Sequence, residues 1–171
     1  DGFSNETRLV ITKGLANAAP NPTIIAFLES VLMNADKCYD CPEVASQALV
    51  RMAPESIANI DFLISDLNSE NHGYRWYDSD FIIRTLASLA PNDPRVRQGF
   101  FSILTDSSTY FDSRLSTAKV YREIGTKNDN VVHFFEKELN APDKTQDAQF
   151  VNAYLLGTIS PGHPAAVKII E

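Results

Sequence analysis

Apolar and polar positions follow a helical period along most of this chain. Between Ser79 and Ala90 the large apolar residues fall three or four positions apart, at Ile82, Ile83, Leu86 and Leu89. Residues at this spacing share one face of an α-helix, so the stretch is predicted to be an amphipathic helix. A second stretch with the same period follows it, and its apolar face consists of Val96, Phe100, Ile103 and Leu104. The pattern predicts two helices in succession.

The connection between these two stretches reads as a tight turn, Pro91-Asn92-Asp93-Pro94. Proline disfavours helix at the preceding residue and cannot continue a helix, so the first helix should end here. Asp93 is a good N-cap, and Pro94 suits the first helical position after it. The turn predicts a helix-turn-helix unit.

This unit recurs along the whole chain. An apolar residue, a small residue and then proline or threonine come back about every 35 residues, within the range typical of repeat proteins. The five copies begin at Ala18, Met52, Leu89, Ile124 and Ile159. A second marker keeps the same interval, as Phe27-Leu28, Phe62-Leu63, Phe100-Phe101, Phe134-Phe135 and Ile169-Ile170. Two markers that recur at the same interval predict a solenoid, in which each unit buries its apolar face against the next unit.

The predicted fold is therefore all-α, a single repeat domain over residues 1–171 made of five helix-turn-helix units. The units are expected at about 6–34, 43–68, 79–106, 113–140 and 149–171. The connections between them, expected at 34–43, 68–79, 106–113 and 140–149, vary in length and composition. The chain opens at Asp1 without methionine and stops at Glu171 inside an expected helix, so we expect a piece of a longer protein.

Composition narrows the possible partners. The sequence has 15 Lys and Arg against 22 Asp and Glu, a net charge of −7. A nucleic-acid surface needs a basic stripe to neutralise phosphates, and the basic residues here are scattered among acids, so no nucleic-acid partner is expected. No apolar run approaches the roughly 18 residues of a membrane span, so no membrane insertion is expected either.

The helix and turn pattern resembles the HEAT repeat family of armadillo-type helical repeats, especially its shorter bacterial HEAT-like form. The resemblance is clearest in Leu89-Ala90-Pro91-Asn92-Asp93-Pro94, and it covers about residues 6 to 171. The units are shorter than the usual 40 to about 47 residues, and the frequent Val-Arg pair of the second helix occurs only at Val96-Arg97. The resemblance implies a right-handed α-α superhelix whose second helices line a concave surface that holds other proteins.

One local motif, Cys38-Tyr39-Asp40-Cys41, contains residues that can form covalent bonds or undergo redox reactions. Two cysteines three positions apart can form a disulfide, act as a redox pair or remain thiols. A zinc site normally needs four ligands, and the chain has no second cysteine pair, so we expect no metal. A disulfide would place the protein in an oxidising, periplasmic or extracellular compartment, whereas free thiols would indicate the cytoplasm.

Aromatic residues in the connections form the first candidate binding site. The connection near Tyr77 also holds Tyr74, Arg75 and Trp76, and a later one holds Tyr110 and Phe111. Tyr, Trp and Arg dominate the binding energy of many protein interfaces, so one edge of the stack is expected to present an aromatic strip. The alternative is that these residues fold over a neighbouring unit and complete its core.

A second candidate site is the less apolar side of the second helices. The positions beside the phenylalanine markers are Glu29, Asp61, Gln98, His133 and Lys137. In a HEAT-like stack these residues would face the concave surface, and the alternative is a face that is only solvated. No phosphate loop, His-Glu metal pair or nucleophile elbow occurs in the sequence, so we expect no catalytic residue and no cofactor.

The sequence therefore favours a non-enzymatic scaffold that binds a protein or peptide at the aromatic edge or the concave face, and its negative net charge suits a basic partner. Two alternatives stay open. One is an enzyme-associated or redox-linked domain that uses Cys38 and Cys41. The other is a structural spacer within a larger protein.

Overall fold

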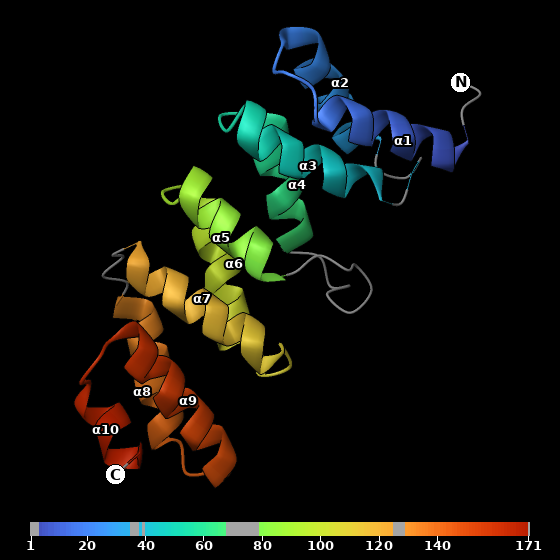
Figure 1. Ribbon diagram of the computed structural model, residues 1–171. Helices are drawn as coiled ribbons and strands as arrows, with labels where there is room; N and C mark the ends of the chain where they lie inside the picture. The colour runs from blue at the N-terminus through green and yellow to red at the C-terminus, as the bar shows by residue number, and fades with distance from the viewer. Residues whose placement is uncertain (1–3, 35–37, 39, 68–78, 125–128, 171) are drawn as a thin grey trace. The chain divides into compact units, whose positions relative to one another are not determined.

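The computed structural model describes residues 4–34, 38, 40–67, 79–124 and 129–170 (Figure 1). Over this part of the chain the structure is all-helical, with ten helices and no strand, which confirms the all-α prediction. Contacts between residues divide the chain into two compact units. The first comprises Asp1–Asp78 and Ser88–Ala90, and the second comprises Ser79–Ala87 and Pro91–Glu171.

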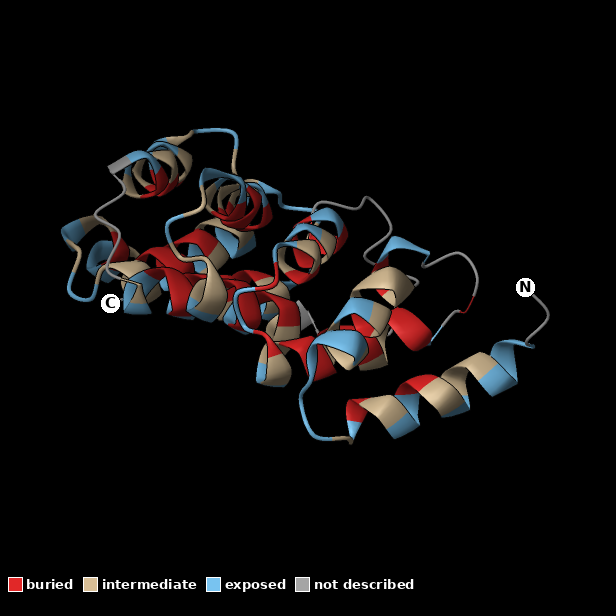
Figure 2. Cartoon of the chain, turned by 90° about the horizontal axis from the view of Figure 1, so that it is seen from above, coloured by how far each residue is buried: buried red, intermediate tan, exposed pale blue. Residues whose placement is uncertain are grey.

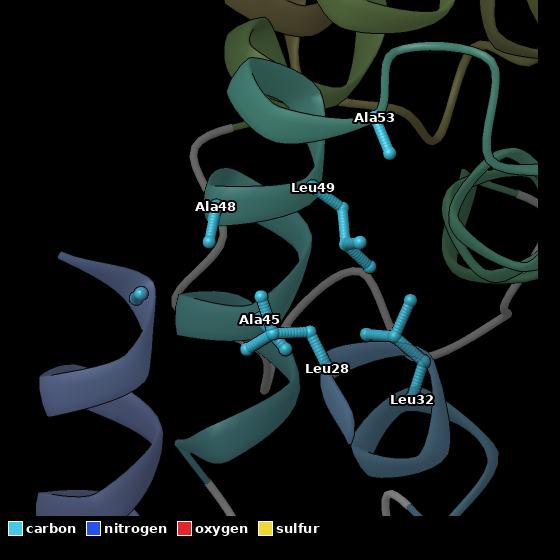
Figure 3. Packing of buried hydrophobic residues seen from close by; sticks show 7 residues of the cluster. Leu28, Leu32, Ala45, Ala48, Leu49 and Ala53 are labelled. Atoms are coloured by element: carbon cyan, nitrogen blue, oxygen red, sulfur yellow. The ribbon is translucent and has the colours of Figure 1, made fainter. Parts of the chain in front are cut away.

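The first unit contains four helices: α1 (Asn5–Ala16), α2 (Pro22–Met33), α3 (Cys41–Met52) and α4 (Ile57–Leu67). Helix α3 packs against α1, α2 and α4. Its buried face supplies three residues of a small apolar core, which consists of Ala16, Leu28, Leu32, Ala45, Ala48, Leu49 and Ala53 (Figure 3). Burying such aliphatic side chains is the main favourable contribution to folding.

Short polar side chains cap the N-termini of the first two helices of this unit. The Ser4 hydroxyl accepts a hydrogen bond from the Thr7 backbone N–H, and Asn21 does the same for Ile24. Each thereby satisfies an N–H that has no partner inside the helix. The connection expected to reach Glu43 is shorter than predicted, because α3 already begins at Cys41, with Pro42 in its first turn.

The second unit contains α5 (Ser79–Leu89), of which the last two residues belong to the first unit, followed by five further helices. These are α6 (Pro94–Thr105), α7 (Phe111–Glu123), α8 (Asp129–Asn140), α9 (Gln146–Ile159) and α10 (Pro164–Ile170). Helix α9 packs against α7, α8 and α10, and α6 packs against α7 and α8. The Phe101 and Phe134 rings join α6 to α8 in an edge-to-face contact, with centroids 6.4 Å apart.

The sequence-predicted turn of this unit is confirmed at its N-cap. The Asp93 carboxylate accepts a hydrogen bond from the Arg95 N–H at 2.8 Å, and Pro94 is the first residue of α6. All four residues of the predicted apolar face of α6 are buried: Val96, Phe100, Ile103 and Leu104. The helix before the turn ends at Leu89, one residue earlier than predicted, a difference within the ordinary fraying of helix ends.

Buried residues follow one side of most helices, and exposed residues follow the other (Figure 2). In each of the first four phenylalanine markers one residue is fully buried, namely Leu28, Leu63, Phe100 and Phe135. The helices in order overlap the five ranges expected from the repeat two by two, and α1, α3, α7 and α9 each begin before the expected start of the range. Among the described helices, none has the length and apolar character needed to cross a membrane.

Candidate functional site

Four exposed aromatic residues gather where α7 begins beside α9, in the second unit. Their exposed fractions are 73% for Tyr110, 42% for Phe111, 43% for Phe150 and 51% for Tyr154. The Phe111 and Tyr154 rings are in contact, with centroids 6.0 Å apart. Phe150 precedes Tyr154 by one turn of α9, so these two side chains are neighbours on the helix surface. We call these four residues the aromatic surface.

A buried arginine positions the first turn of α7 beneath this surface. Arg114 donates hydrogen bonds from Nε and Nη2 to the Leu104 carbonyl oxygen at the end of α6, at 3.1 and 3.0 Å. Its Nη2 also donates to Asn152 Oδ1 on α9, at 3.3 Å. Burial lowers the pKa of Arg114, although the charges of Asp106 and Glu138 oppose this effect. One guanidinium thus connects the three helices that carry or flank the aromatic surface.

Acidic residues lie close in sequence to the residues of the aromatic surface. Asp106, Asp112 and Asp147 are exposed, and the segments 106–112 and 146–159 that carry them contain no lysine or arginine. Asp106 accepts hydrogen bonds from the Ser108 hydroxyl at 2.7 Å and the Ser108 N–H at 2.8 Å. These bonds, with a weaker one from Thr109, lower the pKa of Asp106, so this carboxylate stays ionised at neutral and mildly acidic pH. The surface therefore combines exposed aromatic rings with negative charge.

Large apolar side chains are also exposed in the first unit, but they are distributed differently. Val10, Met33 and Ile57 lie on three different helices. Exposed apolar residues that occur singly are normal and need no functional explanation. Adjacent exposed aromatic rings are uncommon on a protein surface, and they mark the contact sites of many proteins.

The aromatic strip predicted from the sequence overlaps this surface at Tyr110 and Phe111. The prediction for Tyr74, Arg75, Trp76 and Tyr77 falls outside the described residues. The sequence analysis did not identify Phe150 and Tyr154 as exposed. Apolar residues occur around nearly the whole circumference of α9, so the sequence shows no clear polar face; they are Phe150, Val151, Ala153, Tyr154, Leu155 and Leu156. An aromatic pair four positions apart on a helix was the signal that could have found them.

The structure distributes the predicted concave row over both units. Glu29 and Asp61 belong to the first unit, whereas Gln98, His133 and Lys137 belong to the second. Glu29 is half-buried and accepts a hydrogen bond from the Ser56 hydroxyl at 2.6 Å. This contact joins α2 to the start of α4, which gives Glu29 a structural role in the first unit.

Two histidines approach one carboxylate in the second unit. His163 Nε2 lies 3.3 Å from Glu136 Oε1, and His133 Nδ1 lies 3.8 Å from Glu136 Oε2. Each histidine faces a different oxygen of the carboxylate. Among the described residues, no group of three or more His, Cys, Asp or Glu side chains could hold a metal ion. We therefore assign this cluster no metal.

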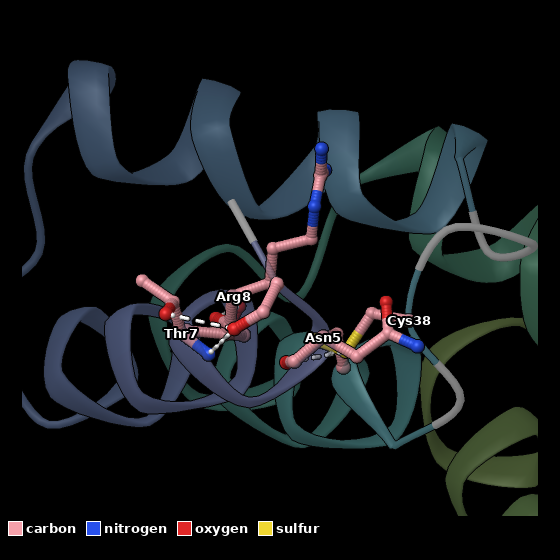
Figure 4. The surroundings of a disulfide bond; sticks show 7 residues. Asn5, Thr7, Arg8 and Cys38 are labelled. Carbon is pink, nitrogen blue, oxygen red and sulfur yellow. Dashed lines mark hydrogen bonds between the residues drawn. A yellow bond between two sulfur atoms is a disulfide. The ribbon is translucent and has the colours of Figure 1, made fainter. Parts of the chain in front are cut away.

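The cysteine motif forms a disulfide between Cys38 and Cys41 at the start of α3 (Figure 4). Their exposed fractions are only 6% and 1%. Cys38 Sγ lies 3.7 Å from the Asn5 carbonyl oxygen, so the disulfide also contacts the first turn of α1. A redox-active pair has to be reached by its exchange partner, and this burial favours a structural disulfide over a redox-linked one.

Replacing both cysteines by alanine is expected to lower the free energy of unfolding by about 2 kcal/mol, because the crosslink no longer restricts the unfolded chain. Urea unfolding of the intact chain measures this loss. The unmodified protein unfolded with a thiol reductant should show a similar loss, which serves as a control for the substitutions themselves. Equal stability of the oxidised protein and the double variant would contradict a structural role.

Comparisons with known proteins do not assign this chain to a family. No family model, curated protein or solved structure matches it. The HEAT-like interpretation therefore remains a prediction from the turn and helix pattern. Function has to be argued from the surface of the molecule.

Proposed function

We propose that this chain is a non-catalytic binding module that holds a basic segment of a partner protein on its aromatic surface. The fold that we propose for it is a right-handed, HEAT-like α-α superhelix of five helix pairs. The observation that carries the function is the group of adjacent exposed rings around the Phe111–Tyr154 contact, with aspartates close to them in sequence. The buried disulfide supports a periplasmic or extracellular location.

The physical basis is the combination of aromatic area and negative charge. Tyrosine and phenylalanine rings lose little conformational entropy on binding, and each can bury a large area. A lysine or arginine of the partner can lie over a ring face while the adjacent carboxylates neutralise its charge. An acidic partner would be repelled by Asp106, Asp112 and Asp147, which is why the surface favours a basic one.

The test uses a library of short random peptides displayed on phage and selected against the intact, oxidised chain. We expect the selected peptides to be enriched in lysine or arginine together with apolar residues. Affinity of a selected peptide for a Phe111→Ala and Tyr154→Ala double variant should fall at least about thirtyfold, the effect of losing roughly 2 kcal/mol at a binding hot spot. Fluorescence anisotropy measures this change.

A matched control is a Val10→Ala and Met33→Ala double variant, which removes two exposed apolar side chains from the first unit. It should bind the selected peptides as tightly as the unchanged protein. Circular dichroism should show the same helix content for both double variants. Peptides without basic enrichment, or peptides that both variants bind equally well, would overturn the proposed site.

The same experiment separates the remaining interpretations. Selected peptides whose affinity falls with Gln98→Ala and Lys137→Ala, and not with the aromatic variant, would move the binding site to the predicted concave row. Selection that enriches no peptide sequence would favour the structural spacer. Both of these outcomes contradict binding at the aromatic surface.

A further inference from the structure

The triplet Asn5-Glu6-Thr7 at the start of α1 has the pattern of an N-glycosylation site. The pattern is asparagine, any residue except proline, and then serine or threonine. One other triplet of the sequence has the same ends, Asn21-Pro22-Thr23, and its middle proline excludes it as an acceptor. Asn5 is therefore the one asparagine of the sequence that meets the pattern. A pattern this short also occurs by chance, so its exposure and its compartment decide whether it can be used.

The Asn5 side chain is accessible in the folded first unit. Asn5 and Thr7 are both exposed. Within the described part of the chain, the Asn5 side-chain amide makes no hydrogen bond. Asn21 differs, because its Oδ1 accepts a hydrogen bond from the Ile24 N–H at 3.0 Å and caps α2. A glycan on Asn5 would thus break no hydrogen bond of the described structure.

The disulfide is a second and independent observation. Cys38 and Cys41 are joined, and disulfides form and persist in the secretory pathway and outside the cell. Glycans on Asn-X-Ser/Thr triplets are a modification of secreted proteins. The Asn5 carbonyl oxygen lies 3.7 Å from Cys38 Sγ, so the triplet and the disulfide are neighbours in the fold (Figure 4). The conditions that form this disulfide are those in which the triplet meets a glycosylating enzyme.

We propose that Asn5 accepts an N-linked glycan when the chain passes through a eukaryotic secretory pathway. The donor is an oligosaccharide activated as a lipid-linked pyrophosphate. The Asn5 amide nitrogen forms a bond to the anomeric carbon of the donor and gives up one proton to a base of the transferase. The bond from that carbon to the pyrophosphate oxygen breaks, and the lipid pyrophosphate leaves with the electron pair. The inference rests on the extracellular location given with the proposed function, and it does not depend on the aromatic surface.

The first turn of α1 has to open for this transfer. Residues two positions apart on a helix do not face each other, so one enzyme site cannot hold Asn5 and Thr7 together while both are helical. Helix ends fray, and the cap of this turn is an exposed hydrogen bond of 3.2 Å from the Thr7 N–H to Ser4 Oγ. We expect transfer before this turn forms or while it is frayed. The exposed position of Asn5 then leaves the glycan in solvent once α1 has formed.

The test expresses the full chain behind a secretory signal in cultured mammalian cells and measures the intact mass of the protein in the medium and in the microsomal fraction. We expect the mass of the chain plus one N-glycan. Treatment with peptide-N-glycosidase should remove the added mass and leave an aspartate in place of Asn5. Asn5→Gln and Thr7→Val should each abolish the modification. Thr7→Ser keeps the hydroxyl group of the pattern and should retain the glycan.

Asn21→Gln is the matched control, because it changes the asparagine of the triplet that proline excludes, and it should leave the glycan in place. Only chains without free thiols are counted, so that entry into the oxidising compartment is established separately. Oxidised chains without a glycan, a glycan that survives Asn5→Gln, or equal loss in Thr7→Ser and Thr7→Val would each overturn the proposal. Peptide binding measured on Asn5→Gln should be unchanged, which keeps this result separate from the test of the aromatic surface.

Discussion

Replacing Arg114 with methionine is expected to lower the free energy of unfolding by about 3 kcal/mol, because it leaves buried acceptors without donors. The Leu104 carbonyl lies in the last turn of α6, where carbonyls have no partner inside the helix. Arg114 supplies that partner twice, and it also donates to Asn152. Methionine keeps much of the side-chain volume but donates no hydrogen bond. Urea unfolding followed by circular dichroism measures the loss.

Arg95→Met is the control for this prediction. Arg95 pairs with Asp93 at 2.7 Å, but its side chain is 54% exposed, and exposed ion pairs contribute little to stability. Hydrogen exchange should show faster exchange at the α6–α7 connection in the Arg114 variant only. Similar stabilities of the two variants would mean that Arg114 is not the connection between α6, α7 and α9.

Replacing Leu49 with alanine is expected to cost about 4 kcal/mol, toward the upper end for leucine in a protein core. Leu49 is fully buried in the core of the first unit, next to Leu28 and Leu32 (Figure 3). Much of the remaining cluster is alanine, namely Ala16, Ala45, Ala48 and Ala53. An alanine side chain has no rotamers with which to fill the space, so the cavity should persist. Differential scanning calorimetry measures the loss.

Val10→Ala is the comparison for this substitution, because Val10 is 65% exposed on α1. Surface substitutions of this kind usually change stability by less than about 0.5 kcal/mol. A Leu49 variant as stable as the Val10 variant would show that the first unit repacks around α3. That result would contradict the expectation that the cavity left by Leu49 persists.

The helix starts and buried helix faces of this protein could be predicted, because they depend on residues that are close in sequence. The Asp93-Pro94 start of α6 and the buried positions Val96, Phe100, Ile103 and Leu104 were predicted in place. Helix caps, proline turns and apolar periodicity all act within a few residues, so the sequence carries them directly. The start of α3 was placed two residues too late, because its helix begins at Cys41 with Pro42 in the first turn.

The candidate sites depended on contacts that periodicity does not encode. Tyr110 and Phe111 were predicted as an aromatic edge, but their neighbours Phe150 and Tyr154 come from a helix about 40 residues further along. The predicted concave row was drawn from equivalent positions in successive repeats. The structure assigns its members to two units and gives Glu29 a contact with Ser56.

The sequence by itself determined the ten helices, their order and most of their buried faces, because these follow from local hydrogen bonding and from the burial of a periodic apolar face. Only the tertiary structure decided that Arg114 holds α7 against α6 and α9, that Phe111 meets Tyr154, and that the disulfide contacts the first turn of α1. Each of these features joins residues from different helices, and such contacts are fixed by packing, since burial selects the arrangement that fills space and pairs polar groups.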